Sequence, residues 1–190
     1  SMLTALYFSA LKPEDRVAVK PHAAPIFHAM QFLAGNLDVE RMKKFRGYGG
    51  VQSYPSRTKD VDDVDFSTGS VGLGVAITSF ASLIQDYISH KKWGTELATG
   101  RMVAMMGDAE LDEGNIYECL QEGWKHNLQN VWWIIDYNRQ SLDGIIHEGL
   151  WERAEKIFEA FGWQVVRVKY GRLQHAAFSE PGGDKLQGWI

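Results

Sequence analysis

Two oxygen-bearing side chains, Asp108 and Asn138, stand at the ends of two apolar runs and lie 30 residues apart in the sequence. The runs, 101–106 and 131–137, have the length and composition of buried strands. In an open parallel sheet, ligands collect at the carboxyl ends of the strands, so we expect both side chains at one site. Mg²⁺ prefers oxygen ligands and is often shared between protein groups and phosphate. The spacing therefore predicts a magnesium and diphosphate site; a simple Gly-Asp turn with Asn138 as a strand cap is the open alternative.

The residues around Asp108 add to this hypothesis. Gly107 has no side chain, which leaves room for a phosphate group to come close. A helix predicted over 111–125, with Asp112 as its N-cap, would point its N–H groups and partial positive charge at a diphosphate. A backbone carbonyl just beyond Asn138 could complete the protein ligands of the metal.

A second loop, 67–74, contains Gly69, Gly72 and Gly74 and leads into a predicted apolar helix over 75–88. Glycines at such a place let the backbone approach either a ligand or a neighbouring helix. Their spacing differs from that of the dinucleotide-binding fingerprint. Both interpretations of the loop stay open.

The remaining pattern predicts the elements that must position these residues. Further strands are expected at 17–20 and 165–168, and further helices at 23–33, 37–45 and 151–161. The long stretch 47–69 is expected to be irregular, and its acidic part, 59–65, to form a solvated turn. Alternation of strands and helices predicts a single-domain α/β fold with a mainly parallel sheet between helices.

Bulk properties exclude several classes of protein. The chain has 190 residues, a formal net charge of −4 and one cysteine, Cys119. It lacks the basic stripe of a nucleic-acid-binding protein and an apolar run of the ~20 residues that span a membrane, and we expect no signal peptide. One cysteine, expected to be buried, suits the cytoplasm. Because 181–190 ends without completing an element, we expect a fragment of a longer chain.

The segment Gly107-Asp108-Ala109-Glu110, with Asn138 at its spacing, resembles the thiamine-diphosphate signature, written Gly-Asp-Gly and then Asn. Similarity to transketolases and to homodimeric-type pyruvate dehydrogenases extends over roughly 10–175. The motifs that carry it lie at 15–25, 53–55, 67–74, 138–144 and 158–163. Pro-His-x-x-Pro and Ser-Tyr-Pro favour pyruvate dehydrogenase, whereas Ser-Thr-Gly and Phe-Glu-Ala-Phe-Gly-Trp favour transketolase.

The resemblance implies a three-layer αβα thiamine-diphosphate-binding fold, with 1–190 as the diphosphate- and magnesium-binding, transketolase N-terminal-like domain. It implies that Mg²⁺ is bound by the side chains of Asp108 and Asn138 and by the carbonyl of Gln140. The residues expected along the diphosphate are Gly107, Ala109 and Glu110, and those expected near the aminopyrimidine are Ser70 and Val71. His22 would lie over the thiazolium, unless it is a capping or core histidine.

Two positions depart from the family pattern. Ala109 stands where the signature has glycine, which restricts the backbone and could change the affinity for the cofactor. Lys20 and Pro21 stand before His22, where the pyruvate dehydrogenases commonly have Gln-Gly. This second departure puts the preference for a 2-oxo acid in doubt.

The resemblance implies a thiamine-diphosphate-dependent enzyme of pyruvate dehydrogenase type that decarboxylates a 2-oxo acid such as pyruvate. The alternatives are transketolase-type transfer of a two-carbon ketol unit between sugar phosphates, and a non-catalytic assembly module with a vestigial site. In these families the glutamate that activates the cofactor lies on a pyrimidine-binding domain, which no part of this sequence resembles. We therefore expect that domain as a partner, on the same or another chain, and little or no turnover by this chain alone. The resemblance also implies a homodimer and a lipoyl-bearing acyltransferase as a further partner.

Overall fold

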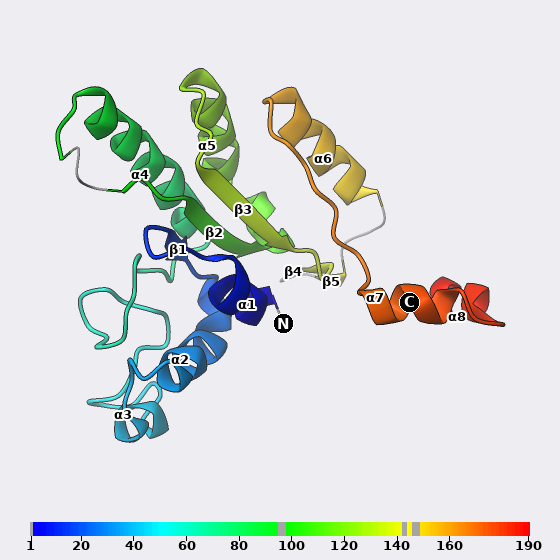
Figure 1. Ribbon diagram of the computed structural model, residues 1–190, viewed down its shortest axis with the longest axis horizontal. Helices are drawn as coiled ribbons and strands as arrows, with labels where there is room; N and C mark the ends of the chain where they lie inside the picture. The colour runs from blue at the N-terminus through cyan, green and yellow to red at the C-terminus, as the bar shows by residue number, and fades with distance from the viewer. Residues whose placement is uncertain (1, 95–97, 142–143, 146–148) are drawn as a thin grey trace.

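A three-stranded parallel sheet forms the centre of the molecule (Figure 1). The computed structural model describes residues 2–94, 98–141, 144–145 and 149–190. The sheet has the order β1 (Arg16–Ala18), β2 (Met102–Gly107), β3 (Val131–Asp136). Gly107 pairs with Asp136 in the register, so the carboxyl ends of β2 and β3 lie side by side. The predicted strands at 101–106 and 131–137, and their parallel pairing, are confirmed.

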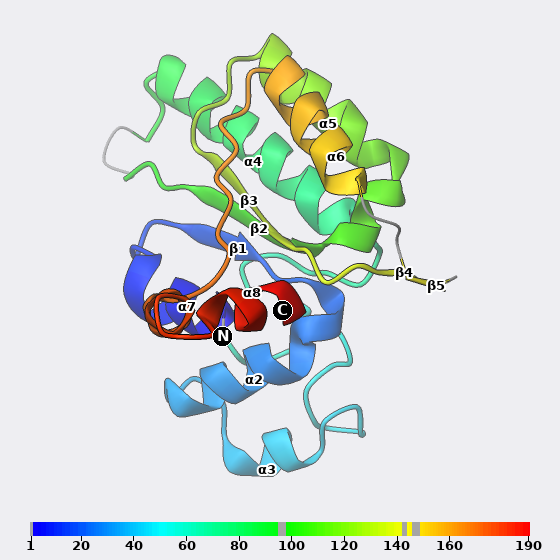
Figure 2. The same ribbon diagram turned by 90° about the vertical axis from the view of Figure 1, so that its right-hand side faces the viewer.

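Helices cover both faces of this sheet (Figures 1 and 2). One layer consists of α4 (Leu73–His90), α5 (Gly114–Lys125) and α6 (Leu150–Ala160). The other consists of α1 (Met2–Ala5), the π-helical turn η1 (Leu6–Ala10), α2 (Ala24–Leu33) and α3 (Val39–Lys43). The predicted α/β fold, with helix layers on both sides of a parallel sheet, is confirmed. Among the described residues, none of the helices combines the length and apolarity needed to cross a bilayer.

The central strand β2 builds a hydrophobic core on each of its faces. Val103 and Met105 belong to a cluster with side chains from β1 and α2, whereas Ala104 and Met106 belong to a cluster with side chains from α4, α5 and α6. All six residues of β2 are buried. A strand covered on both faces needs a continuous apolar run rather than alternation, which is the pattern that 101–106 shows.

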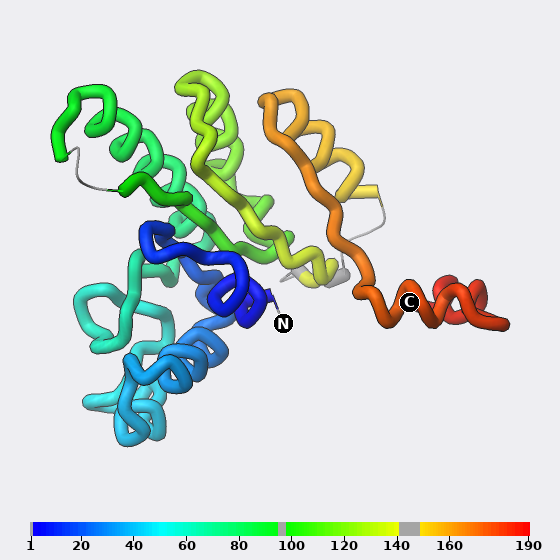
Figure 3. The backbone as a smooth tube through the Cα atoms, in the orientation of Figure 1, coloured from blue at the N-terminus to red at the C-terminus, as the bar shows by residue number. Residues whose placement is uncertain are grey.

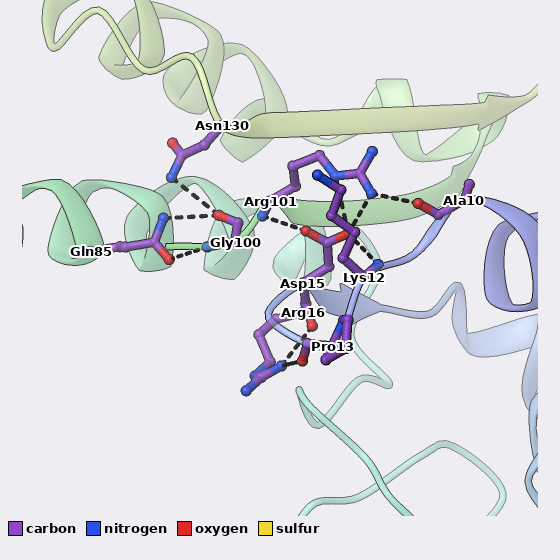
Figure 4. A network of polar contacts seen from close by, with 9 residues as sticks. All are labelled: Ala10, Lys12, Pro13, Asp15, Arg16, Gln85, Gly100, Arg101 and Asn130. Atoms are coloured by element: carbon purple, nitrogen blue, oxygen red, sulfur yellow. Dashed lines mark hydrogen bonds and ion pairs between the residues drawn. The ribbon is translucent and has the colours of Figure 1, made fainter. Parts of the chain in front are cut away.

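A polar network fastens the amino-terminal end of the sheet (Figure 4). The carboxylate of Asp15 accepts hydrogen bonds from the backbone N–H of Arg101 at 2.7 Å and from its Nε at 3.0 Å. The backbone N–H of Lys12 donates to the same carboxylate at 2.9 Å. Although burial raises the pKa of Asp15, these donors outweigh it and lower the pKa to about 2. The ionised pair joins the segment before β1 to the start of β2.

The cysteine is structural, as expected. Cys119 lies on α5 and is buried. Burial, with smaller contributions from Glu118 and Glu122, raises the pKa of its thiol to about 11. A thiol in this state is a poor nucleophile at neutral pH, because the thiolate is the reactive form.

The predicted strand at 165–168 is wrong, because residues 163–170 form no strand. Val165 packs against the hydrophobic cluster that includes side chains from α4, α5 and α6. Trp163 lies against Trp133 with ring centroids 4.5 Å apart. Val166 and Val168, in contrast, are 71% and 90% exposed. An apolar, β-branched run favours an extended chain, but a strand also needs a partner for its backbone hydrogen bonds. This segment runs beside α6 without joining the sheet (Figure 3).

The acidic run is not the solvated turn that the sequence predicts. Asp62 is buried and its carboxylate lies 2.6 Å from Nδ1 of the buried His28 on α2. The carboxylate of Asp65 accepts a hydrogen bond from the N–H of Val17 in β1 at 2.8 Å. Asp60 accepts two further bonds from backbone N–H groups of the same loop. The loop has no regular secondary structure, and the contacts of these carboxylates hold it in place. The acidic run therefore has a structural role.

The C-terminal segment carries two short helices that the sequence did not predict. They are α7 (Arg172–Phe178) and α8 (Gly183–Trp189), which pack against each other. They extend away from the body of the molecule (Figure 1). Leu173 and Trp189 are both more than 80% exposed.

Candidate functional site

Asp108 is the centre of the candidate site. It follows β2, begins the 3₁₀ turn η3 (Asp108–Asp112) and is buried. Its Oδ2 accepts a hydrogen bond from the backbone N–H of Arg139 at 2.7 Å, and its Oδ1 accepts one from the N–H of Ala109 at 3.1 Å. The structure therefore joins the end of β2 to the segment that follows β3.

The segment after β3 holds Asn138 and Gln140, both exposed. The side-chain oxygen of Asn138 accepts a hydrogen bond from the N–H of Gln140 at 2.9 Å. Between them Arg139 has a φ of 62°, in the left-handed region. This turn brings the N–H of Arg139 to Asp108, so Asn138 and Gln140 flank the residue that Asp108 holds. Gln140 and Ser141 then form β4, which pairs with β5 (Gly144–Ile145).

Glu110 connects the site to the glycine-rich loop. Its carboxylate is buried and accepts hydrogen bonds from the N–H of Gly107 at 3.1 Å and from the N–H of Gly72 at 3.0 Å. Ser70 and Val71, both exposed, directly precede Gly72. Glu110 thus fixes the loop at the end of β2. In the structure Glu110 stands three residues after Gly107, the N-cap residue of η3, as the acid of a capping box does.

Gly72 explains why the loop needs glycine. Its φ is 79°, and a Cβ at this position would lie 2.4 Å from Oδ1 of Asn115 on α5. The loop therefore approaches a neighbouring helix closely, and its backbone also faces the candidate site. The interpretation as close packing against a neighbouring helix is confirmed. The approach of this backbone to a ligand stays a prediction.

Lys20 lies across the same end of the sheet, which sequence reasoning did not foresee. Its Nζ is 3.6 Å from Oδ2 of Asp136, the last residue of β3. A Cβ on Gly107 would lie 2.7 Å from this Nζ. The ammonium group therefore occupies the space that the absent side chain of Gly107 leaves open.

His22 stands close behind β1, in the 3₁₀ turn η2 (Pro21–Ala23), and its side chain is exposed. A buried core histidine is thereby excluded at this position. His28 is the core histidine of this region, since it is 1% exposed. Because β1 is parallel to β2 and β3, His22 lies beyond the same edge of the sheet as the carboxyl ends of β2 and β3.

One local prediction is wrong. The predicted helix over 111–125 begins later, as α5 at Gly114, and Glu113 rather than Asp112 is its N-cap residue. Residues 108–112 instead form η3, because the two hydrogen bonds of Glu110 hold the chain against the end of β2 and the glycine-rich loop.

The residues present fit a magnesium-bound diphosphate. Asp108 supplies a carboxylate, Asn138 an amide oxygen and Gln140 a carbonyl, which are hard oxygen ligands suited to Mg²⁺. Over the described ranges, no group of three acids, histidines or cysteines forms a different metal site. The ammonium of Lys20 lies over Gly107, and it supplies positive charge beside Asp108.

Comparison with known proteins finds a family match. Residues 12–179 match the family described as transketolase, thiamine diphosphate binding domain. The pyruvate dehydrogenase E1 component of Mycolicibacterium smegmatis is 30% identical over 165 residues, which are 83% of this chain and 18% of that protein. A transketolase of Staphylococcus aureus is 27% identical over 152 residues, 79% of this chain and 23% of that protein. The chain thus spans about a fifth of the length of these relatives.

Solved structures show the same fold. Transketolase from Leishmania mexicana superimposes with a TM-score of 0.75 at 23% identity, over 88% of this chain and 27% of that one. A transketolase mutant from Pichia stipitis, in complex with fructose-6-phosphate, gives a TM-score of 0.72 at 26% identity, over 81% and 23%. With the family match covering most of its length, this chain belongs to the transketolase thiamine-diphosphate-binding domain family, a family of thiamine-diphosphate-dependent enzymes.

Proposed function

We propose that this chain binds thiamine diphosphate by its diphosphate, through Mg²⁺ held by Asp108, Asn138 and the carbonyl of Gln140. The observation that carries the proposal is the hydrogen bond from the N–H of Arg139 to Asp108, which unites the two halves of the ligand set. When bound, the cofactor supplies a nucleophilic ring carbon and an electron sink. The protein's task is to hold and orient it.

Each remaining residue of the site has a part in this binding. Gly107 and Ala109 flank Asp108 and would lie along the diphosphate. Glu110 keeps Ser70 and Val71 at the site through Gly72, where they would meet the aminopyrimidine. His22, exposed behind β1, would present a polar group to the substrate.

For the whole protein, we propose decarboxylation of a 2-oxo acid such as pyruvate. This is supported by the 30% identity to a pyruvate dehydrogenase E1 component and by Pro-His-x-x-Pro at 21–25. Transfer of a ketol unit between sugar phosphates is the second candidate, which is favoured by the structural likeness to transketolases. A vestigial assembly module is the third.

The proposed partners follow from the missing half of the site. The pyrimidine-binding domain, on the same or another chain, would supply the activating glutamate. A homodimer and a lipoyl-bearing acyltransferase accompany the pyruvate dehydrogenase proposal. We propose a cytoplasmic location for such an assembly.

Calorimetric titration of this chain with thiamine diphosphate tests the proposed binding. Heat of binding should appear with Mg²⁺, disappear with EDTA and be lost in Asp108→Ala. Asp112→Ala is the matched control, since Asp112 is an exposed acid at the other end of η3. Equal binding with EDTA, or no binding at all, would contradict the proposal and favour a vestigial site.

Assay of the protein that joins this chain to a pyrimidine-binding domain separates the two reactions. Pyruvate with an artificial electron acceptor tests the first, and transfer from a ketose phosphate to an aldose phosphate tests the second. Detectable pyruvate decarboxylation by this chain alone would contradict the proposed division of the site between two domains.

A further inference from the structure

The position of Lys20 at the end of the sheet is specific. The side chain is 15% exposed, starts two residues after β1 and crosses the end of β2 at Gly107 to reach Asp136 at the end of β3. It therefore spans all three strands at the edge where parallel sheets bind ligands. A surface lysine usually keeps its ammonium in water, so an ammonium that lies across the end of the sheet is unusual.

The contact with Asp136 leaves most of the ammonium's bonding capacity unused. The distance from Nζ to Oδ2 is 3.6 Å, longer than the 2.7–2.9 Å of a charge-assisted hydrogen bond. The side chain of Asp136 is 40% exposed, so water weakens the attraction. In the part of the chain that the structure describes, Asp136 is the ion-pair partner recorded for Lys20, whereas an ammonium has three N–H donors.

We propose that Lys20 is a diphosphate-binding residue whose ammonium moves from Asp136 to a phosphate oxygen when the cofactor binds. This inference rests on the proposed function, because it requires the diphosphate to lie beside Gly107. The Nζ atom already lies 2.7 Å from where a Cβ of Gly107 would be. A group that fills the space over Gly107 must contact Lys20 or displace it, and an anion gains by the contact.

The proposed role gives a physical meaning to a departure from the family pattern. The resemblance to the pyruvate dehydrogenases implies neutral Gln-Gly before His22, whereas this chain has Lys20 and Pro21. Pro21 fixes the backbone directly after Lys20 and starts η2. Lys20 then adds a second positive charge, besides Mg²⁺, to the phosphate end of the site.

Calorimetric titration with thiamine diphosphate, and separately with inorganic diphosphate, both with Mg²⁺, tests the inference. Lys20→Met keeps the length of the side chain and removes its charge, and we expect affinity for both ligands to fall about tenfold or more. Lys20→Arg should retain most of the affinity. Lys43→Met is the control, because Lys43 is exposed on α3 and its loss changes the net charge equally. Circular dichroism and thermal melting verify that each variant folds.

The phosphorus NMR signals of bound thiamine diphosphate provide a second readout, since loss of the Lys20 contact should shift them relative to the wild-type complex. If the wild-type chain binds these ligands and Lys20→Met binds them equally or more tightly, Lys20 has no effect on binding or obstructs it. In that case the inference about Lys20 fails and the proposed function stands. If the wild-type chain binds neither ligand, the proposed function fails and the inference with it.

Discussion

The carboxylate of Asp108 accepts a hydrogen bond at 2.7 Å from the backbone N–H of Arg139, a residue 31 positions further along the chain. Arg139 adopts a left-handed conformation, and Asn138 and Gln140 stand on either side of it. The side chain directly after β2 thus fixes the backbone turn that carries the other proposed metal ligands. Asp108 has a structural role as well as its proposed role in metal binding.

Two substitutions of Asp108 separate these roles. Asn keeps an oxygen that can accept from Arg139 and loses only the longer bond from the N–H of Ala109, so we predict that Asp108→Asn lowers the free energy of unfolding by about 1 kcal/mol or less. Ala leaves the N–H groups of Arg139 and Ala109 without their acceptor and should cost about 1–3 kcal/mol. Both variants should lose magnesium-dependent binding of thiamine diphosphate. Urea unfolding and calorimetry measure the two effects, and retained binding in Asp108→Asn would contradict the role of its charge.

Glu110 is predicted to hold the glycine-rich loop in place. In Glu110→Gln one acceptor oxygen becomes an NH₂ group, so either Gly107 or Gly72 loses its partner. We expect a loss of about 1–3 kcal/mol in unfolding free energy and faster amide hydrogen exchange at Gly72. Glu118→Gln, at an exposed position on α5, is the control. Unchanged exchange at Gly72 would show that the loop is fixed by other contacts.

The close approach at Gly72 is tested by comparing two glycines. Gly72 and Gly35 have φ values of 79° and 84°, but a Cβ meets Oδ1 of Asn115 at 2.4 Å in the first and nothing within 4 Å in the second. Gly35→Ala should therefore cost only the backbone strain, about 1–2 kcal/mol. Gly72→Ala should cost more, because Asn115 must also move. Equal losses of unfolding free energy, measured by chemical denaturation, would mean that Asn115 moves away without a cost in energy.

The buried pair of His28 and Asp62 predicts a pH dependence of stability. Nδ1 of His28 faces the carboxylate of Asp62 at 2.6 Å and Nε2 faces the carbonyl of Gln52 at 3.1 Å. Because both partners are acceptors, the ring satisfies both only when doubly protonated. Burial lowers the pKa of His28, but the hydrogen bond and charge of Asp62 outweigh it and raise the pKa above its usual value.

A raised pKa in the folded state means that the folded protein binds the proton more tightly than the unfolded chain does. The stabilisation is therefore fully present below about pH 6.5, the unfolded value, and is lost as pH rises through the raised pKa. In urea unfolding from pH 6 to 9, the difference in unfolding free energy between the wild-type protein and His28→Gln should shrink as the pH rises. Asp62→Asn should flatten the dependence. Parallel curves for the wild type and His28→Gln would contradict the prediction.

The amino-acid sequence alone is enough to predict the framework of this fold and the proposed ligands. The apolar runs at 101–106 and 131–137 specify buried parallel strands, because a strand covered on both faces has to be apolar throughout. Their ends then identify Asp108 and Asn138 without any coordinates. The same reasoning failed at 165–168, because β propensity records a preference for extended backbone and not the presence of a hydrogen-bonding partner.

Contacts between side chains of segments distant in the sequence are visible in the folded molecule alone. The acids of 59–65 look solvated as a local pattern, yet Asp62 is buried because His28 comes from another element to meet it. Glu110 and Lys20 acquire their positions in the same way, from Gly72 on a different loop and Asp136 on a different strand. Such contacts depend on the packing of elements in three dimensions, which local spacing does not encode.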